Sequence, residues 1–286
     1  MPGTIHDALR LARRPTRVMT CVALAAASTV LASGCGTSGG SGDEVLTAVR
    51  PAEIVMPAER EITTVVDPSQ SFPREYLVES LRVLAGAVRA LPVRLPPTGA
   101  FAGAAGVHFS LRSIGGDSYA PSAMELEARI PGVPAIADIT TGANGDIDMQ
   151  GAVNSSEQRR AATVAAQDAR TVADDLAAKL EQLELPVTHC SDIQGAVSAA
   201  AETFGDSPGA GHLLIVISDF DQSCDVNVSG SLEGVDFLGV LVCDDAVVCQ
   251  ERQQAWGERL RDARSARFVR LEEAAATVRD LLRGAS

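Results

Sequence analysis

Residues 61–66, Glu-Ile-Thr-Thr-Val-Val, are followed by Asp67-Pro-Ser69-Gln-Ser71 and then by residues 73–84, Pro-Arg-Glu-Tyr-Leu-Val-Glu-Ser-Leu-Arg-Val-Leu. The first segment predicts a buried strand and the last a helix, because proline is well placed where a helix begins. The turn between them carries an acid and two hydroxyls, each two residues apart. Open α/β sheets bind ligands beyond the carboxyl ends of their strands, so this turn is a candidate site.

Two further segments carry similar residues later in the chain. The first is residues 188–192, Thr-His-Cys-Ser-Asp, just before a predicted helix, where Ser191 also qualifies as the N-cap. The second is residues 212–219, His-Leu-Leu-Ile-Val-Ile-Ser-Asp, an apolar run that predicts a central parallel strand. Asp219, at the end of that strand, would then lie on the same edge of the sheet as Asp67.

The order of these segments resembles a von Willebrand factor A (VWA) domain. The features that carry the resemblance are an Asp-x-Ser-x-Ser turn, a Ser-Asp-Ile loop and an apolar strand ending in Ser-Asp. The resemblance covers roughly residues 61–282, and the predicted VWA-like domain spans residues 61–284. It implies a doubly wound, Rossmann-like α/β fold. Strands that alternate with helices along the chain predict the same mostly parallel sheet flanked by helices.

The three loops are similar to the metal-ion-dependent adhesion site, or MIDAS, of that family. The ligands that this resemblance implies are Asp67, Ser69, Ser71, Ser191 and Asp219. The hydroxyls of Ser69 and Ser71 would bind the cation directly, and the two carboxylates would bind it directly or through water. Ser191 stands where the family usually has threonine, which keeps the hydroxyl. Oxygen ligands suit a hard divalent cation, with Mg²⁺ favoured and Mn²⁺ or Ca²⁺ also compatible.

One position departs from the family pattern. The family usually has glycine directly after its last aspartate, whereas Phe220 follows Asp219 in this chain. The resemblance therefore leaves the path of this loop open, although it retains the carboxylate.

The remaining elements follow from periodicity. Residues 107–114 and 123–130 both alternate and are separated by a Gly-Gly-Asp-Ser turn, which predicts a hairpin. Residues 131–153 lack periodicity and predict a loop over the sheet or near the site. The other expected strands are 61–66, 213–217, 235–242 and 267–271, and the expected helices are 73–91, 155–185 (opened by Ser156), 191–204, 246–263 and 272–282.

The N-terminus predicts export and a lipid anchor. Four arginines between residues 10 and 17 precede an apolar stretch at residues 18–33, which is too short for a comfortable membrane span. The sequence then reads Leu-Ala-Ser-Gly-Cys35, which resembles a bacterial lipobox. We expect a lipoprotein signal peptide at residues 1–34, and a lipidated Cys35 with a flexible tether at residues 35–60. The mature protein would be anchored on the extracytoplasmic face of the cell membrane. A secreted protein without lipid is the alternative.

The charge of the chain excludes some classes of partner. The 286 residues include 37 acidic and 24 basic ones, which gives a net charge of −13. Removal of residues 1–34 takes away four Arg and one Asp, a net +3, and leaves −16. Nucleic-acid binding depends on neutralising phosphates, so such a surface argues against it. It also argues against adhesion to anionic lipid headgroups beyond the acyl anchor.

Four cysteines remain after the signal peptide and Cys35 are set aside. An even number outside the cytoplasm predicts two disulfides, for which three connectivities are possible. We favour Cys190–Cys224, because both residues would lie on loops at the metal edge, and Cys243–Cys249, which would close a short local segment. A zinc site is the rival, but the usual short spacing between paired cysteines is missing.

The favoured function is a binding module, in which a divalent cation recognises a carboxylate on a protein ligand. The alternative is a metal-independent structural or assembly lipoprotein of the cell envelope. A metal-assisted hydrolase is the least favoured, and we expect no enzyme, because the motif lacks a general base. Of the histidines near the proposed edge, His212 begins a strand at the opposite end and His189 is a loop residue.

Overall fold

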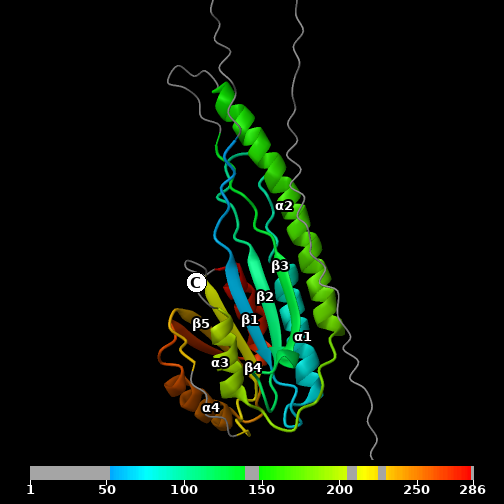
Figure 1. The fold of residues 1–286 in the computed structure, drawn as a ribbon, viewed down its shortest axis with the longest axis vertical. Helices are drawn as coiled ribbons and strands as arrows, with labels where there is room; N and C mark the ends of the chain where they lie inside the picture. The colour runs from blue at the N-terminus through cyan, green and yellow to red at the C-terminus, as the bar shows by residue number, and fades with distance from the viewer. Residues whose placement is uncertain (1–51, 139–147, 205–210, 225–229, 285–286) are drawn as a thin grey trace, which may run out of the picture. The chain divides into compact units, whose positions relative to one another are not determined.

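The computed structural model describes residues 52–138, 148–204, 211–224 and 230–284. Six strands form one sheet in the order β3-β2-β1-β4-β5-β6 (Figure 1). β3 is antiparallel to β2, and all other neighbours are parallel. The strands are β1 Arg60–Val66, β2 Val107–Ser113, β3 Met124–Ile130, β4 His212–Ser218, β5 Val235–Leu241 and β6 Ser265–Arg270. The predicted fold class and hairpin are therefore confirmed.

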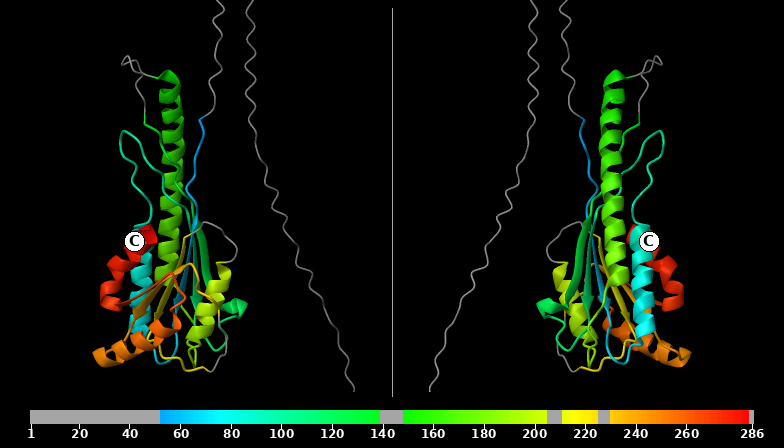
Figure 2. Two further views of the ribbon diagram at one scale, coloured as in Figure 1. Left: turned by 90° about the vertical axis from the view of Figure 1, so that its left-hand side faces the viewer. Right: turned by 90° about the vertical axis from the view of Figure 1, so that its right-hand side faces the viewer.

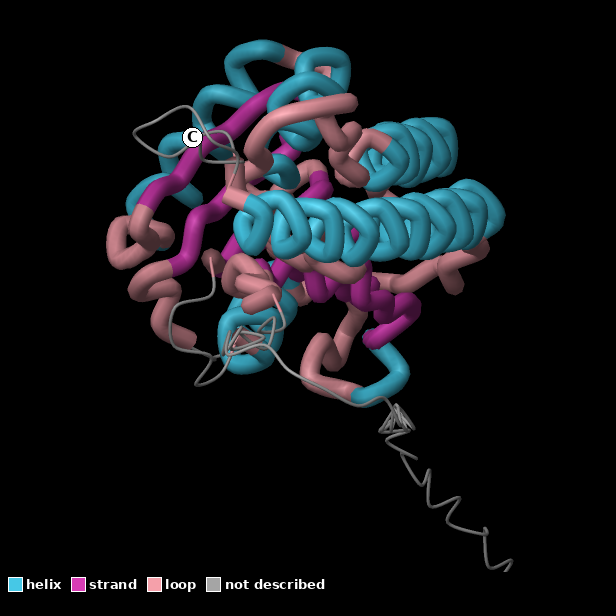
Figure 3. Tube along the Cα trace, turned by 90° about the horizontal axis from the view of Figure 1, so that it is seen from above, coloured by secondary structure: helices cyan, strands magenta, loops and turns pink. Residues whose placement is uncertain are grey.

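Helices cover both faces of the sheet (Figure 3). α1, α2 and α5 pack together against one face, and α3 and α4 contribute to the core on the other. They are α1 Arg74–Arg89, α2 Met149–Gln182, α3 Ile193–Thr203, α4 Ala246–Arg259 and α5 Leu271–Arg283, with a short 3-10 helix at Pro121–Ala123. Among the described residues, none of these helices has the length and apolar character needed to cross a bilayer. The signal peptide, Cys35 and most of the predicted tether lie outside the described residues.

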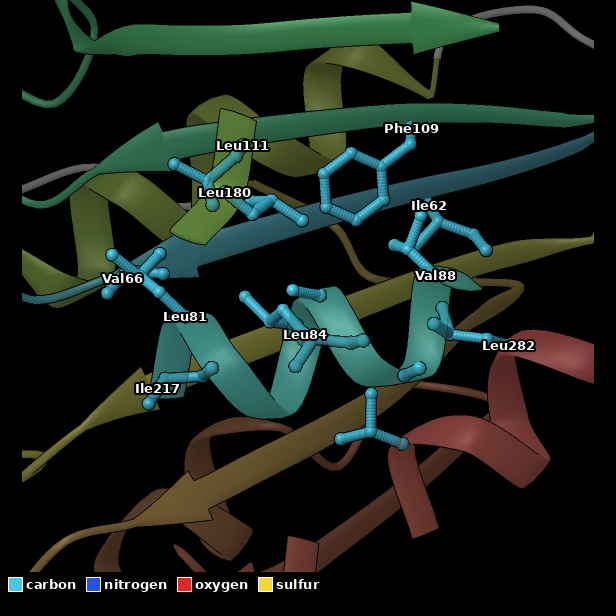
Figure 4. Packing of buried hydrophobic residues seen from close by; sticks show 14 of the residues in the cluster. Ile62, Val66, Leu81, Leu84, Val88, Phe109, Leu111, Leu180, Ile217 and Leu282 are labelled. Atoms are coloured by element: carbon cyan, nitrogen blue, oxygen red, sulfur yellow. The ribbon is translucent and has the colours of Figure 1, made fainter. Parts of the chain in front are cut away.

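The central strands are apolar on both faces because helices cover both. On β1, Ile62 and Val66 face the cluster with α1, while Val65 faces the cluster with α3. Leu84 and Val88 of α1 are fully buried against the sheet (Figure 4). Burial of each such side chain contributes about 1.5–3 kcal/mol, so the two layers hold the strands in place. This double coverage explains why β4 reads as a continuous apolar run.

The strand order reverses between β1 and β4. The chain leaves β1 towards β2 on one side of the sheet and leaves β4 towards β5 on the other. Loops that diverge in this way open a crevice at the carboxyl ends of the two strands. The backbone N–H of Asp67 donates to the carbonyl of Ile217 at 3.0 Å, which brings the two strand ends side by side.

The long helix begins earlier than expected. We expected residues 155–185, opened by Ser156, but α2 starts at Met149, and the Asp148 side chain accepts from the Gln150 N–H at 3.1 Å. Ser155 lies inside the helix, and its hydroxyl donates to the Ala137 carbonyl at 3.1 Å. The expected start was therefore too late, because Asp148 rather than Ser156 caps the helix, and the end of the expected loop at 131–153 is helical.

The described part of that loop also lies away from the predicted site. β-Bridges join Phe101 to Ile136 and Ala104 to Val133, beyond the end of the sheet at which β2 begins. Val133 and Ile136 form a third apolar cluster with the N-terminal half of α2. Figure 2 shows α2 extending past the sheet, with these segments alongside it. The expectation of a loop near the site was wrong for residues 131–138, because the antiparallel β3 returns the chain to the opposite end of the sheet. Residues 139–147 of that loop lie outside the described residues.

Residues 52–59 are tied to this same region. The Val55 carbonyl accepts from the Ala135 N–H at 3.3 Å, and the Glu53 carbonyl accepts from the Gln158 side chain at 3.1 Å. This segment, which the sequence placed in the tether, therefore contacts the domain before β1 begins.

A glycine on β5 makes room for the loop that follows β4. A Cβ added at Gly239 would clash with the Phe268 ring and meet Phe220 Cζ at 3.0 Å. Phe220 packs edge-on against Phe268 and Trp256, with centroids 5.6 Å apart in each case. The missing side chain at Gly239 thus provides the space in which Phe220 fixes its loop.

Gly239→Ala is expected to lower the free energy of unfolding by about 1–3 kcal/mol, because the extra methyl overpacks this cluster. The matched control is Gly257→Ala in α4, where an added Cβ meets nothing within 4 Å. That substitution should raise the free energy of unfolding by about 0.5–1 kcal/mol, since alanine favours the helix. Urea denaturation of both variants measures the difference, and equal effects would contradict this account of Gly239.

Candidate metal centre

Asp67 is the centre of the candidate site. Its side chain is fully buried directly after β1. The carboxylate accepts from the Ser69 N–H at 2.9 Å, from the Ser218 hydroxyl at 2.8 Å, and from the Ser191 hydroxyl at 3.1 and 3.2 Å. A carboxylate has about four acceptor positions, so these donors satisfy most of them. Because the donors come from three segments, Asp67 fixes the relative positions of three loops.

Three hydroxyls gather in the segments around this carboxylate. Ser69 Oγ lies 3.0 Å from Ser71 Oγ, and the pair extends from the buried Ser69 to the exposed Ser71. Ser191 is fully buried and directs its single proton at Asp67. Its oxygen lone pairs remain free, as a cation ligand requires. The structure thus brings together the loops that carry the predicted hydroxyl ligands.

The N-cap of α3 is Asp192 rather than Ser191. The Asp192 carboxylate accepts from the Gly195 N–H at 2.8 Å, which is the capping bond. The Gln222 side-chain amide, in the loop after β4, also donates to this carboxylate at 3.3 Å. The interpretation of Ser191 as a cap therefore fails, because the residue after it takes that position.

Asp219 lies directly after β4 and is 8% exposed. Burial is the main cause that raises the pKa of its carboxyl, and the charge of Asp67 raises that pKa further. A hydrogen bond from the Asp221 N–H at 3.0 Å and the charge of Arg252 oppose the rise. The raised pKa reflects mainly the burial of this carboxylate, which disfavours its charged form.

Arg252 of α4 is a neighbour that the sequence analysis missed. Its Nη1 donates to the Asp219 carbonyl at 2.5 Å and lies 3.7 Å from Asp219 Oδ2. Its Nη2 lies 3.4 Å from an Asp221 carboxylate oxygen. Nothing in the sequence around Arg252 indicates this role, since it comes from a helix 33 residues later in the chain.

Ser218 is a second residue that was missed as part of the site. Its hydroxyl donates to Asp67 and accepts from the Phe220 N–H at 2.9 Å. The sequence did contain a signal for Ser218, namely its position at the end of an apolar strand. A buried hydroxyl at a strand end needs a polar partner, so it belongs near other polar groups of the site.

Phe220 adopts a backbone conformation that favours glycine. Its φ of 60° lies in the left-handed region, and it is the only non-glycine residue with positive φ among those described. This conformation costs about 1–2 kcal/mol for an L-residue. The Phe220 carbonyl accepts from Trp256 Nε1 at 3.1 Å, and its ring is buried. Tertiary contacts thus hold the loop that the departure from glycine had left open.

The favoured disulfide pairing is confirmed. Cys190 bonds to Cys224 and Cys243 bonds to Cys249, with Cα atoms 5.5 and 5.8 Å apart. With these thiols paired, the rival zinc site loses its ligands. Within the described ranges, no cluster of three or more His, Cys, Asp or Glu side chains is placed to hold a metal. A cation here would therefore rely on hydroxyl oxygens as well as carboxylates.

The Cys190–Cys224 bond joins two loops of the site. Beside it, the Ser191 N–H donates to the Ser223 hydroxyl at 2.8 Å, and the Ser191 carbonyl accepts from the Ser223 N–H at 3.1 Å. The covalent link and these hydrogen bonds hold Ser191 against the loop that follows Asp219.

The histidines occupy the positions expected from the sequence. His212 begins β4 at the opposite end of the sheet, where it stacks on Phe204 and lies 3.8 Å from Glu61. His189 is exposed in the loop before Ser191. Asp225, a further acid near the site in sequence, lies outside the described residues.

Comparisons with known proteins give only distant likenesses. Neither a family model nor a curated protein matches this sequence. The structure is similar to proximal thread matrix protein 1 from the mussel byssus, with a TM-score of 0.40 and 10% identity over 82% of this chain and 48% of that one. It is also similar to the manganese-loaded TRAP protein of Plasmodium vivax, with a TM-score of 0.36 and 13% identity over 81% and 76% of the two chains.

A third likeness is to BatB from Bacteroides thetaiotaomicron, with a TM-score of 0.34 and 13% identity over 77% of this chain and 96% of that one. The chain spans about half the length of the mussel protein. Because these scores are below 0.5, the likenesses carry no argument about family, metal or function. The fold class rests on the sheet order and the helices on its two faces.

Asp219→Asn is expected to stabilise the protein at neutral pH in the presence of EDTA. The raised pKa means that the folded protein binds this proton more tightly than the unfolded chain, so ionisation of Asp219 costs stability as pH rises. The gain in Tm should be present at pH 7 and vanish below the ordinary value of 3.8. The control is Asp168→Asn, at an exposed position on α2. A loss of stability in Asp219→Asn at pH 7 would contradict the assignment.

Removal of the disulfide that closes the longer loop should cost more stability, because the entropy of loop closure grows with the logarithm of loop length. Replacing Cys190 and Cys224 by serine opens a separation of 34 residues, for which chain entropy gives about 4 kcal/mol. Replacing Cys243 and Cys249 opens a separation of 6 residues, for which it gives about 2 kcal/mol. Guanidinium denaturation of the two double variants checks the order, and a larger loss for the second pair would contradict it.

Proposed function

We propose that the chain carries a VWA-type domain that binds a divalent cation and, through it, a carboxylate on a protein ligand. The observation that supports this most directly is the buried carboxylate of Asp67, to which the Ser191 and Ser218 hydroxyls both donate. This carboxylate lies where the strand order reverses, which is where open α/β sheets bind ligands.

The residues present fit a hard divalent cation. Neighbouring ligands of an octahedral Mg²⁺ at 2.0–2.1 Å lie about 3 Å apart. The oxygens of Ser69 and Ser71 are 3.0 Å apart, so they match two adjacent positions. Asp219 adds a second indication, because a bound cation would balance its buried carboxylate beside the buried carboxylate of Asp67. We favour Mg²⁺, with Mn²⁺ or Ca²⁺ as alternatives.

Each residue has a distinct role in this proposal. Ser69 and Ser71 would ligate the cation directly, and Ser191 would present its lone pairs once its proton is held by Asp67. Asp67 would mainly position the hydroxyls, since its acceptor positions are mostly used. Asp219 would supply charge directly or through water. The bound cation would supply the positive charge that lets an acidic protein accept an acidic ligand.

We further propose that the domain acts on the extracytoplasmic face of the cell membrane, held by lipid on Cys35. The sequence from the basic segment to Cys35 supports the anchor. The two disulfides support an oxidising compartment. We propose binding rather than catalysis, because His189 is the only histidine at this edge among the described residues, and it is exposed. A nucleic-acid partner does not suit the net charge of −13.

One observation favours the alternative of a metal-independent structural lipoprotein. The donors to Asp67 satisfy this carboxylate through protein groups alone. In that case the hydroxyls would serve only to join the three loops, and the surface would act in envelope assembly without a cation.

Calorimetric titration with Mg²⁺ and Mn²⁺ separates the two functions. The protein would carry Cys35→Ser, which removes the predicted acylation site. We expect saturable binding at one site, weakened about tenfold or more by Ser71→Ala. Ser71 is exposed, so its loss should spare the fold, and Ser122→Ala at another exposed position is the matched control. Absence of binding at millimolar metal would favour the structural alternative.

The ligand half of the proposal needs its own test. A peptide library with a single aspartate in each member would be compared with the same library carrying asparagine. Binding that requires both the aspartate and Mg²⁺, and that Ser71→Ala weakens, is the expected result. Equal binding of the asparagine peptides, or binding that persists in EDTA, would contradict recognition through a cation.

A further inference from the structure

A large cleft lies at the end of the sheet opposite the candidate metal centre. Its volume is about 1210 Å³, and its walls come from the end of α1, residues 92–105, the start of β2, residues 130–133, α2 and the end of α5. Figure 2 shows these segments beside the middle of α2. Arg60, which begins β1, lines the cleft, whereas Asp67 follows the end of that strand. Seven residues of strand, about 23 Å, separate the two places.

The charge of the cleft is opposite to that of the chain. Five arginines line it, and none of the described lining residues is acidic, although the chain has 37 acidic and 24 basic residues. These five are Arg60, Arg89, Arg94, Arg170 and Arg283. A local excess of guanidinium groups in a strongly acidic protein favours an anionic ligand.

Three of the five arginines have structural partners. Arg60 donates to the carbonyls of the last turn of α5, at 2.5 and 2.9 Å. Arg283 donates to the Ala90 carbonyl, at 3.0 and 2.8 Å, and Arg89 makes two hydrogen bonds with Glu181. These contacts hold the ends of α1 and α5 together at the wall of the cleft.

The other two arginines are free to bind a ligand. Arg94 and Arg170 are exposed, and neither makes a hydrogen bond or ion pair with the residues that the structure describes. Arg94 comes from the segment after α1 and Arg170 from α2, so they approach the cleft from different elements. Guanidinium groups bind carboxylate and phosphate through paired N–H donors.

The rest of the lining is largely apolar. Leu91, Val93, Leu95 and Phe101 are each only partly buried, so they present apolar surface to the cleft. Val133 lies behind them in the third apolar cluster. Apolar surface next to unpaired cations matches a ligand with an aliphatic chain and an anionic head, and does not match a free inorganic anion.

The walls are fixed parts of the fold. The bridges of Phe101 with Ile136 and Ala104 with Val133 consist of paired backbone hydrogen bonds of 2.8–2.9 Å. Arg159 of α2 donates to the carbonyls of Pro96 and Gly99, at 2.8 and 2.7 Å.

Gly103 allows a close approach within these walls. Its φ is +87°, and an added Cβ would meet Pro57 Cγ at 2.9 Å. The cleft is therefore preformed, as small-molecule sites usually are.

We propose that this cleft binds an anionic amphiphile, a single aliphatic chain that carries a carboxylate or a phosphate. Arg94 and Arg170 hold the head group, and the surface formed by Leu91, Val93, Leu95 and Phe101 covers the chain. The volume of about 1210 Å³ exceeds the roughly 300–1,000 Å³ of usual small-molecule sites, so it accommodates a long chain. This site is independent of the cation and adds a second ligand class to the protein.

Displacement of a fluorescent fatty acid from the Cys35→Ser protein tests this proposal. The competitors are a sixteen-carbon fatty acid, the alkyl phosphate and the alcohol of the same length, and inorganic phosphate alone. Arg94→Gln and Arg170→Gln remove the proposed head-group contacts. Arg160→Gln is the matched control, because Arg160 is exposed on the same helix and does not line the cleft.

We expect both anionic amphiphiles to bind at one site and the alcohol to bind about tenfold more weakly or worse. Arg94→Gln and Arg170→Gln should each weaken the anionic competitors by about tenfold, and Arg160→Gln should leave them unchanged. EDTA and Ser71→Ala should have no effect, which separates this site from the cation site. The proposal is overturned if the alcohol binds equally well, if phosphate alone binds as tightly as the alkyl phosphate, or if Arg160→Gln weakens binding as much as Arg170→Gln.

Discussion

The buried carboxylate of Asp67 is the interaction on which the candidate site depends. It accepts hydrogen bonds from its own turn, from the loop before α3 and from the end of β4. A buried charge without partners would be costly, so the three segments are held to the positions that satisfy it. The core below them provides the rigid base, because β1 and β4 are covered on both faces. Because the buried carboxylate needs these donors, its position determines where the hydroxyls of Ser191 and Ser218 lie.

Much of this arrangement was predictable because it depends on local sequence and simple topology. The apolar runs located β1 and β4, and parallel strands place their carboxyl ends on one edge, so Asp67 and Asp219 had to be neighbours. What could not be predicted depends on tertiary contacts. Arg252 approaches Asp219 from α4, and Ser155, the first residue of the expected long helix, lies inside α2 and donates to the Ala137 carbonyl. The cleft arises where segments far apart in the sequence pair with each other, so no motif marks it.

The two proposed sites divide the chemistry of the molecule between opposite ends of the sheet. At one end, the buried acids Asp67 and Asp219 lie among serine hydroxyls. At the other, five arginines line a partly apolar cleft. The net charge of −13 describes neither end, because it averages over both. Composition therefore speaks only for the surface as a whole, while the local arrangement of charges determines which ligand each end favours.

The length of α2 has a mechanical consequence. Its 34 residues span about 51 Å, so one continuous rod passes the cleft at Arg170 and ends nine residues before Ser191. Helices transmit displacement along their axis with little compression, and the Cys190–Cys224 bond attaches the next segment to the loop after β4. The rod therefore acts as a spacer that keeps the cleft and the candidate metal centre at a fixed separation, so that each site can bind its ligand without displacing the other.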